Sequence, residues 1–356
     1  MQTFADKTSI SIKDIARLAN VSHSTVSRAL RNSSLVNRET AERIQKIARE
    51  SGYLASAVAR SLVNRTTQTV GVVVTNITDP FIGEVVSGIE SVCNDRGYSV
   101  VLANSNADPD REIKVVRSFG ERRVDGILVA ASRVGAVYSQ LLASMEVPIV
   151  LINNQHPGDL SHSIMIDNVT ASKRAMAHLI GLGHRRIAYL GDRFGFQSDT
   201  ERFTGYRRAL EESDLPFLPE LVCHGNGKAD EGVLAMGQLL RLPALPTAVF
   251  CYNDMTALGA LQAVNLRGLR VPEDISLVGF DDLLIASYTA PPLTTVRQPK
   301  QEMGRAAMGM LLDLLAGKSL ETHIKMQGEL IVRGSTAAPA SAAIGARPYG
   351  QETGSV

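Results

Sequence analysis

Residues 11–30, SIKDIARLANVSHSTVSRAL, constrain the fold most, because they contain two short helical patterns separated by a tight turn. In the first pattern, Ser11 is a candidate N-cap and Asp14 favours the positive end of the helix. The apolar residues that repeat there at helical spacing are Ile12, Ile15, Leu18 and Ala19. The turn falls at Asn20, a residue type that tolerates a left-handed backbone better than most. The pattern predicts a helix-turn-helix unit.

The second helix of this unit has a polar face made of hydrogen-bond donors. Ser22 is its candidate cap, and its expected inward face consists of Val26, Ala29 and Leu30. The side chains expected to point outward are His23, Ser24, Ser27 and Arg28. Residues near the start of a recognition helix contact base edges in the major groove, and Arg can bind guanine with both arms of its guanidinium. A small helical hairpin with a solvated face is the alternative interpretation.

Charge is distributed unevenly along the chain, although its formal net charge is only +1. Residues 1–65 contain 11 Lys or Arg and 5 Asp or Glu, whereas the remainder contains 26 and 31. A basic N-terminal part joined to a mildly acidic body is typical of a DNA-contacting module attached to a domain that does not bind phosphate. A solvated basic face alone would give the same charges.

Two further helical segments are expected before the main body of the chain. One runs from about Arg38 to Ser51, with Asn37 as its cap and Gly52 at its end. Its apolar face consists of Ala41, Ile44, Ile47 and Ala48. The other covers residues 56–62, which are too few to hold a helix in water unless the segment docks on another surface. A disordered linker is the alternative there.

From Val70 onward, short apolar runs alternate with amphipathic stretches. The runs are VGVVV (70–74), YSVVLA (98–103), DGILVA (125–130), PIVLIN (148–153), RIAYLG (186–191), AVFCY (248–252) and ISLVGF (275–280). Continuous β-branched runs separated by helices predict parallel strands that are buried on both faces. About 270 residues of this kind exceed one doubly wound sheet, so we expect two lobes.

Short polar residues follow several of these runs. They are Asn76, Asp79, Asn153, Asn253, Asp254, Asp281 and Asp282. Ligands of open α/β sheets bind at the carboxyl ends of the strands, and several amides and carboxylates together suit a hydroxyl-rich ligand. For any one of these residues, a helix cap is the simpler explanation.

Specific motifs occur along most of the chain: IKDIARLANVSHSTVSRAL, SAVARSL, VDGIL, GLGHRRIAYLG, ERFTGY, CYNDMTALGAL, LRVPEDISLVGFDD, PPLTTVRQP and VRGST. In these motifs, the chain resembles the lactose/galactose repressor family of bacterial transcription regulators over about residues 10–336. The resemblance implies an α plus α/β fold with a helix-turn-helix domain, a hinge helix and a two-lobed core similar to periplasmic binding proteins. The expected boundaries are a flexible N-terminus (1–9), the helix-turn-helix domain (10–52), the hinge helix and linker (53–68), the effector-binding and dimerisation domain (69–336) and a disordered tail (337–356).

The resemblance also implies roles for residues in the DNA-binding part. The base-reading positions of the family fall on His23, Ser24 and Arg28, and its phosphate-contacting hydroxyls fall on Ser22, Thr25 and Ser27. In the hinge, Ala59 is an expected DNA contact and Leu62 matches a leucine that family members insert into the minor groove. Ala55 stands where proline is usual, which leaves the start of the hinge helix less rigid. The partner implied is palindromic double-stranded operator DNA, bound by a homodimer.

In the core, the resemblance implies a site for a small effector between the lobes. The expected effector-binding residues are Phe81, Asn153, Arg202, Asn253, Asp281 and Gln298. Arg only donates and a carboxylate only accepts, so Arg202 and Asp281 can hold vicinal hydroxyls from two sides. Two positions depart from the purine-binding members: Phe196 replaces a second arginine, and Gly227 replaces an aromatic platform. We therefore expect a sugar or sugar derivative, with a purine-type corepressor as the alternative.

Other classes of function find little support in the sequence. The chain has no GxSxG, GxGxxG, P-loop or HExxH motif, and adjacent residues such as Asp281 and Asp282 usually point apart, so we expect no enzyme and no cofactor. The three cysteines (Cys93, Cys223 and Cys251) have no metal-binding or disulfide spacing, and His156 and His162 share a loop as ordinary surface histidines. Without a signal-like N-terminus or an apolar span, a cytoplasmic protein is expected rather than an exported, non-regulatory sugar-binding protein. The tail carries no heptads, which argues against a tetramer.

Overall fold

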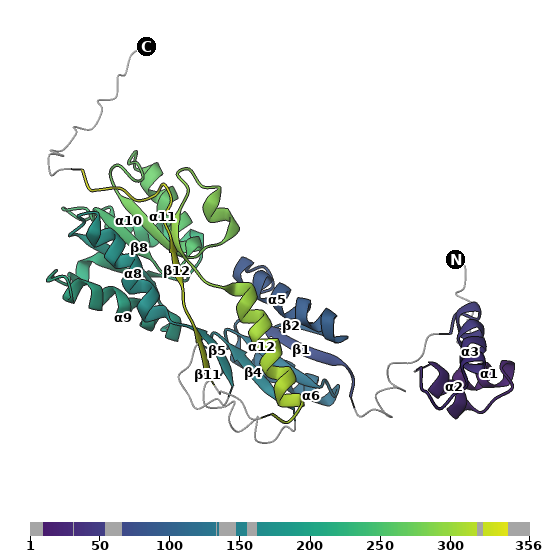
Figure 1. The fold of residues 1–356 in the computed structure, drawn as a ribbon. Coiled ribbons are helices and arrows are strands. Elements are labelled where there is room, and N and C mark those ends of the chain that lie inside the picture. Colours follow the sequence, from purple (N-terminus) through teal and green to yellow (C-terminus); the bar gives the residue numbers. More distant parts are fainter. Residues whose placement is uncertain are drawn as a thin grey trace, which may run out of the picture. The chain divides into compact units, whose positions relative to one another are not determined.

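A computed structural model describes residues 10–30, 32–53, 66–132, 134, 147–154, 162–318 and 323–340 of the 356-residue chain. The chain divides into two compact units, Met1–Gln68 and Thr69–Val356, and each has its own set of elements (Figure 1). The expected hinge helix, residues 56–62, lies outside the described residues.

The N-terminal unit contains three helices, α1 (Ile12–Leu18), α2 (His23–Leu30) and α3 (Arg38–Glu50). Ser11 caps α1 as expected: the Asp14 N–H donates to Ser11 Oγ at 3.3 Å, and the Ser11 N–H donates to Asp14 Oδ2 at 3.0 Å. The expected left-handed turn is confirmed, since Asn20 has a φ of 51°. Asn37 caps α3 by accepting a hydrogen bond from the Glu39 N–H at 2.9 Å.

These helices enclose a small apolar core. Its buried residues are Ile15, Ala16, Ala19, Val26, Ala29 and Ile44. Leu18, expected on the inward face of α1, is instead 60 % exposed, so that prediction was wrong. The inward face passes through Ala16 and Ala19, whose small side chains let the helices approach closely, and Leu18 falls at its edge.

The first lobe of the second unit is built on a parallel sheet in the order β11-β5-β4-β3-β1-β2. Its strands are β1 (Thr69–Val74), β2 (Ser99–Asn104), β3 (Gly126–Ala130), β4 (Ile149–Ile152), β5 (Ser163–Ile166) and β11 (His323–Met326). Helices α5 (Pro80–Arg96) and α12 (Lys300–Leu315) pack together on one face, and α6 (Pro109–Glu121) packs on the other. A Cβ at Gly88 or Gly304 would overlap the backbone of the opposite helix, so α5 and α12 are in close contact (Figure 1).

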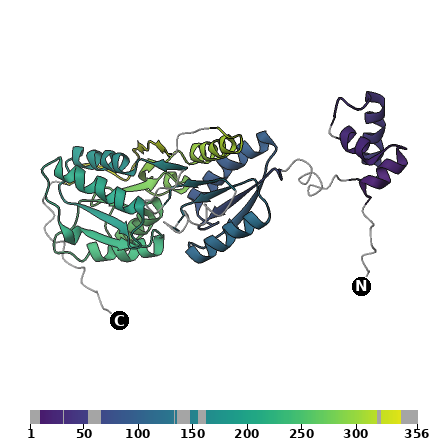
Figure 2. The same cartoon turned by 90° about the horizontal axis from the view of Figure 1, so that it is seen from below.

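The second lobe contains a sheet in the order β12-β10-β9-β8-β6-β7, in which only the β10–β12 pair is antiparallel among the described strands. Its strands are β6 (Ile187–Asp192), β7 (Val222–Gly225), β8 (Ala248–Cys251), β9 (Ser276–Asp281), β10 (Thr294–Arg297) and β12 (Glu329–Ile331). Helices α10 (Ala229–Leu239) and α11 (Asp254–Leu266) cover one face, and α8 (Asn168–Gly181) and α9 (Gln197–Glu211) cover the other (Figure 2). Two short 3-10 helices are η1 (Pro219–Leu221) and η2 (Leu284–Ser287).

The chain passes between the lobes three times: after β5, after β10 and after β11. The first and third crossings are bonded together, because the Asp167 N–H donates to the Met326 carbonyl at 2.8 Å and Gln327 Nε2 donates to Asp167 Oδ2 at 3.3 Å. The second crossing, at Gln298–Pro299, leads directly into α12.

The expected two-lobed α/β architecture is confirmed. All seven apolar runs form strands. The expectation that they are buried on both faces was wrong for residues 98–103, because β2 is an edge strand and exposes Val101 and Leu102. The strands β5, β7, β10, β11 and β12 were missed because polar residues interrupt their apolar runs. The described chain continues to residue 340, and the Ala337 carbonyl is bonded to His184 Nε2 at 2.8 Å. The rest of the expected disordered tail, residues 341–356, lies outside the described part of the chain.

Candidate DNA-binding surface and effector site

Helix α2 presents two different faces, as its sequence predicts. Val26 and Ala29 are buried against the other helices, whereas His23, Ser24 and Arg28 are exposed. The three expected base-reading side chains therefore lie on the surface of one helix. Their contact with bases stays a prediction, as do the hinge contacts of Ala59 and Leu62, which fall outside the described residues.

The hydroxyl groups at the start of α2 form a small cluster. Ser22 Oγ accepts the Thr25 N–H at 3.1 Å and lies 2.8 Å from Thr25 Oγ1 and 2.7 Å from Ser24 Oγ. Ser22 is exposed, and Thr25 and Ser27 are half-buried. Hydroxyl groups at the N-terminus of a helix suit a phosphate, which agrees with the expected role of Ser22, Thr25 and Ser27.

Helix α3 holds α2 in place through polar side chains that the sequence analysis did not single out. Gln45 Nε2 donates to the Ala29 carbonyl at 3.1 Å and to Asn32 Oδ1 at 2.8 Å. Arg43 Nη2 donates to the Ala19 carbonyl at 3.2 Å, just before the turn. Both contacts satisfy carbonyls at helix ends and so fix the angle at which the exposed face of α2 is presented.

In the core, three of the expected effector residues form a hydrogen-bonded chain that joins the lobes. Asn153 follows β4 of the first lobe, and its Nδ2 donates to Gln298 Oε1 at 3.4 Å. Gln298 lies at the second crossing, and its Nε2 donates to Asp281 Oδ1 at 2.6 Å. Asp281 ends β9 of the second lobe. Gln298 and Asp281 are 2 % and 7 % exposed, so their polar groups depend on protein or ligand partners.

Arg202 of α9 completes this cluster from the side of the second lobe. Its Nη2 lies 3.8 Å from Asp281 Oδ1, its Nε donates to Asn168 Oδ1 at 3.0 Å, and its Nη1 donates to the Tyr252 carbonyl at 2.5 Å. The guanidinium carbon lies 3.7 Å from the ring centroid of Phe280 and 4.8 Å from that of Tyr252. A buried guanidinium with this many partners is held in one orientation.

Two carboxyl groups of the cluster have raised pKa values. Burial raises the pKa of Asp281 to about 6, although the Arg202 guanidinium acts in the opposite direction. Burial and the neighbouring Asp281 raise the pKa of Asp254 to about 8. At neutral pH, Asp254 is therefore mainly protonated, and Asp281 is the carboxylate that can accept hydrogen bonds from a ligand.

The other two expected effector residues are placed differently. Asn253 caps α11, since its Oδ1 accepts from the N–H and the Oγ1 of Thr256 at 2.8 Å each, and its Nδ2 donates to the Gly227 carbonyl at 2.9 Å. Phe81 lies near the start of α5 in the first lobe and is half-buried against that lobe's core. The nearby Asp79 acts on the pKa of Asp281, which indicates that this end of α5 faces the cluster.

The structure also shows which residues surround Phe196 and Gly227, the two positions that argue against a purine-type ligand. Gly227 has a φ of 75°, and a Cβ there would lie 3.3 Å from Tyr252 Cε1 and 3.5 Å from Asp192 Oδ2. A larger side chain would be strained and crowded at this position. Phe196 precedes α9 and packs on Phe194, with ring centroids 5.6 Å apart.

Several residues of the site were missed by sequence reasoning. Asn168, Tyr252 and Phe280 surround Arg202, and Lys300 binds the backbone at Asp281. Phe280 precedes Asp281, and Tyr252 precedes Asn253, two residues that the sequence analysis selected at strand ends. This adjacency is the one sequence signal that could have identified Phe280 and Tyr252. Nothing in the local pattern around Asn168 or Lys300 points to the site.

The remaining expectations concern features away from this cluster. Asp281 and Asp282 do point apart, since Asp282 binds Arg297 Nε at 2.7 Å and Arg333 Nη2 at 2.6 Å. Cys93, Cys223 and Cys251 are free thiols. The described residues contain no group of three or more His, Cys, Asp or Glu that could hold a metal ion. In the described part of the chain, no helix combines the length and the apolar composition required to cross a membrane.

Comparison with known proteins agrees with this arrangement. Residues 11–56 match the family described as bacterial regulatory proteins, lacI family, and residues 176–336 match a periplasmic binding protein-like domain. The HTH-type transcriptional repressor PurR of Vibrio atlanticus is 37 % identical over 324 residues, which cover 90 % of this chain and 97 % of PurR. The HTH-type transcriptional repressor CytR of Escherichia coli is 37 % identical over 339 residues, which cover 95 % and 99 %.

Solved structures give the same result. A Lac repressor dimer bound to operator and the anti-inducer ONPF matches with a TM-score of 0.86 at 27 % identity, covering 93 % of this chain and all of that one. A complex of the transcriptional regulator CelR with cellobiose matches with a TM-score of 0.69 at 31 % identity, covering 92 % and 99 %. The chain therefore belongs to the lacI family of bacterial regulatory proteins and is a DNA-binding transcriptional regulator with an effector-binding core.

Proposed function

We propose that this regulator is a repressor that binds a palindromic operator as a homodimer and is controlled by a small sugar or sugar derivative. The observation that carries the proposal is the chain of Asn153, Gln298, Asp281 and Arg202, which connects the two lobes. A ligand that binds these residues would contact both lobes at once. Its binding energy would therefore depend on how the lobes are arranged.

The chemistry of this chain favours a hydroxyl-rich ligand. Asp281 offers acceptors, Arg202 offers donors, and the amide of Gln298 offers both, so a pair of neighbouring hydroxyls can be bound as donor and acceptor. Asn253 can add one N–H, because its oxygen already caps α11 and its other amide hydrogen is donated to the Gly227 carbonyl. The crowding at Gly227 argues against an aromatic platform there. The cellobiose bound by the similar CelR supports the sugar class.

We propose that α2 reads the operator through His23, Ser24 and Arg28, while Ser22, Thr25 and Ser27 contact phosphates. Exposure of the first three side chains and the hydroxyl cluster at the helix start support this assignment. Leu62 of the hinge would insert between base pairs and bend the operator, with Ala59 as a further contact. Leu62→Ala should then bend the operator less, as measured by the gel mobility of fragments that carry it at different positions.

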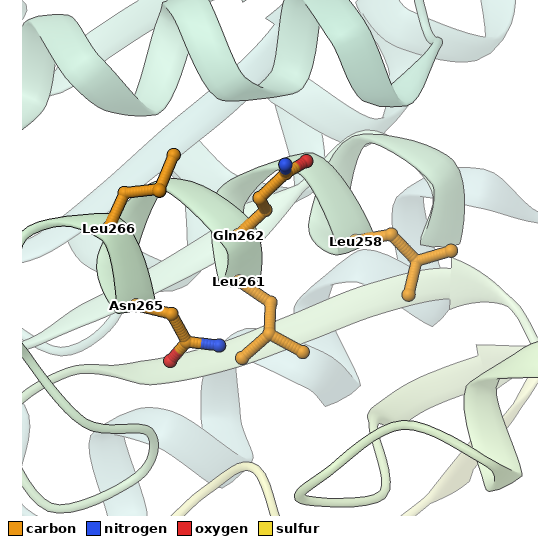
Figure 3. Close-up of a pocket in the computed structure, with 5 residues that line it drawn as sticks. All are labelled: Leu258, Leu261, Gln262, Asn265 and Leu266. Carbon is orange, nitrogen blue, oxygen red and sulfur yellow. The ribbon is translucent and has the colours of Figure 1, made fainter.

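The homodimer is supported by apolar surface on both lobes. On α11, a hollow of about 350 Å³ is lined by Leu258, Leu261, Gln262, Asn265 and Leu266 (Figure 3). Leu266 is 73 % exposed, and Leu234 of the adjacent α10 is 63 % exposed. On the first lobe, the edge strand β2 exposes Val101 and Leu102. Exposed apolar side chains grouped in this way are typical of protein contacts, and we propose that a twofold dimer covers them. Leu266→Asp should shift sedimentation toward monomer.

A thermal-shift screen tests the effector class. Sugars, sugar phosphates and purines are compared on the wild type and on Arg202→Ala, with Arg305→Ala as a matched surface control. We expect a sugar to raise the melting temperature of the wild type and of Arg305→Ala but not of Arg202→Ala. A purine that stabilises the wild type when every sugar fails would overturn the sugar class. A hit that stabilises Arg202→Ala equally would place the site elsewhere.

A further inference from the structure

Lys300 is the first residue of α12, directly after the second crossing between the lobes. Lys300 is only 4 % exposed, although its side chain ends in an ammonium group. Helix α12 belongs to the first lobe, where it packs against α5 with the close contacts at Gly88 and Gly304 (Figure 1). The position of Lys300 is therefore set by the first lobe.

The ammonium group of Lys300 binds the second lobe. Its Nζ donates to the carbonyl of Asp281 at 2.6 Å and to the carbonyl of Asp282 at 2.8 Å. It also lies 3.3 Å from Oε1 of Glu84, which is on α5 of the first lobe. An ammonium has three donors, so all three have an acceptor here. Two of these interactions cross from one lobe to the other.

The backbone that Lys300 binds is strained. Asp281 has a φ of 118° and Asp282 has a φ of 51°, both in the region that favours glycine. Such conformations persist only when surrounding contacts hold them. Lys300 binds the carbonyl of each residue, and Arg297 and Arg333 hold the Asp282 side chain. The direction of the Asp281 carboxylate depends on this strained backbone.

We propose that Lys300 is a positioning residue that couples the arrangement of the lobes to the carboxylate of Asp281. The proposal rests on the proposed function, in which Asp281 binds the effector. When the lobes move relative to each other, Lys300 and Glu84 move with the first lobe, and the bonds to the two carbonyls break. The end of β9 then relaxes, and the carboxylate turns away from its orientation toward Gln298. An effector that binds Asp281 would in turn favour the arrangement in which Lys300 is bonded.

The charge of Lys300 gives the proposal a second support. Burial raises the pKa of Asp281, the Arg202 guanidinium lowers it, and the Lys300 ammonium adds a smaller effect in the same direction as Arg202. Lys300 therefore favours the ionised form of the carboxylate that its backbone contacts orient. Methionine at this position has a similar length but neither donors nor charge, whereas arginine keeps the charge with a different geometry.

Hydrogen exchange of the full-length protein without ligand tests the positioning role. The variants are Lys300→Met, Lys300→Arg and Glu84→Gln, with Lys318→Met as the matched control, because Lys318 follows the same helix but is exposed and binds only Asp313 among the described residues. We expect amides of residues 281–288 to exchange on the order of tenfold faster in Lys300→Met, less so in Lys300→Arg and Glu84→Gln, and unchanged in Lys318→Met. Unchanged exchange at 281–288, or an equal increase throughout both lobes, would overturn the proposal. If Lys300→Met does not fold, Lys300→Arg and Glu84→Gln still decide it by the same local readout.

Operator affinity tests the coupling, using a DNA sequence selected by the wild type from a random pool. Lys300→Met should change this affinity at least about fivefold although it lies outside the DNA-binding unit, and Lys318→Met should not. Faster local exchange with unchanged operator affinity would reduce Lys300 to a structural residue and overturn the coupling. If the wild type selects no DNA, the result contradicts the proposed function. The hydrogen-exchange experiment would still test the contact of Lys300 with the end of β9.

Discussion

In the N-terminal unit, the side chains expected to read bases (His23, Ser24 and Arg28) lie exposed on one eight-residue helix, whereas the effector site is built from buried and half-buried side chains of elements between α5 and α12. None of these three exposed side chains belongs to the buried apolar core of the unit. The buried set is bonded to itself across both lobes. Changes at the first should therefore alter DNA binding with little loss of stability, and changes at the second should alter stability and ligand binding together.

The largest effect that would sharpen this contrast is expected for Arg202→Ala. Removing the buried guanidinium takes away the cation beside Asp281 and the donor to the oxygens of Asn168 and Tyr252. The free energy of unfolding should fall by about 4 kcal/mol, as measured by urea denaturation, with loss of effector binding. The surface control Arg305→Ala should cost less than about 0.5 kcal/mol. Equal stability of Arg202→Ala and the wild type would contradict the expectation that changes in the effector site alter stability and ligand binding together.

Within the N-terminal unit, the apolar core rather than the DNA-contacting face should determine stability. Ile44 is fully buried, so Ile44→Ala should destabilise this unit by about 3 kcal/mol. Leu18→Ala, at an exposed position of the same unit, should cost less than about 0.5 kcal/mol. Circular dichroism during thermal unfolding measures both changes. A large loss for Leu18→Ala would contradict the outward position of that side chain.

The buried acids of the effector site predict a pH dependence of stability. The pKa of Asp254 is raised to about 8 in the folded protein from its ordinary value of 3.8, so the folded state binds the proton more strongly than the unfolded state. Protonated Asp254 therefore stabilises the folded state at low pH, and this stabilisation is lost as the pH rises toward 8. Asp254→Asn can still accept from the Leu283 N–H and bond to Thr295, and it removes the titration.

Denaturation at several pH values measures this difference. Between pH 6 and pH 8, the wild type should lose about 2 kcal/mol more stability than Asp254→Asn. A carboxylate of the DNA-binding unit serves as the contrast: the side-chain hydrogen bond from Ser11 lowers the pKa of Asp14 below its ordinary value of 3.8, so Asp14 is ionised throughout this range and Asp14→Asn should leave the slope unchanged. Parallel curves for the wild type and Asp254→Asn would show that Asp254 ionises normally.

The smallest of these effects on folding, and the most specific in function, is expected for Arg28→Ala. Losing a bidentate contact should cost about 1 to 2 kcal/mol of binding at one operator position, with unchanged unfolding. Thr25→Val should instead weaken all sequences alike, since a phosphate contact carries no sequence information. Selection of operators from random DNA by each variant separates the two outcomes. An unchanged preference for Arg28→Ala would remove it from the base-reading set.

The sequence alone determined those features that depend on neighbouring residues. The caps at Ser11 and Asn37, the turn at Asn20 and the two faces of α2 follow from local spacing, because a helix brings residues three and four apart to one face. The seven strands predicted from the sequence and the two lobes follow from uninterrupted runs of apolar, mainly β-branched residues. The family motifs located Asn153, Arg202, Asp281 and Gln298, which the structure brings together.

Only the tertiary structure decided the remaining features, since they depend on residues distant in sequence. Leu18 is exposed because the packing of three helices selects Ala16 and Ala19 for the interface. Asn253 caps α11 with its amide oxygen and donates its Nδ2 to the Gly227 carbonyl, two contacts that its strand-end position leaves open. Lys300 reaches the carbonyls of Asp281 and Asp282 because the chain crosses between lobes just before α12. Contacts of this kind arise from how strands are ordered in the two sheets, which local sequence patterns do not encode.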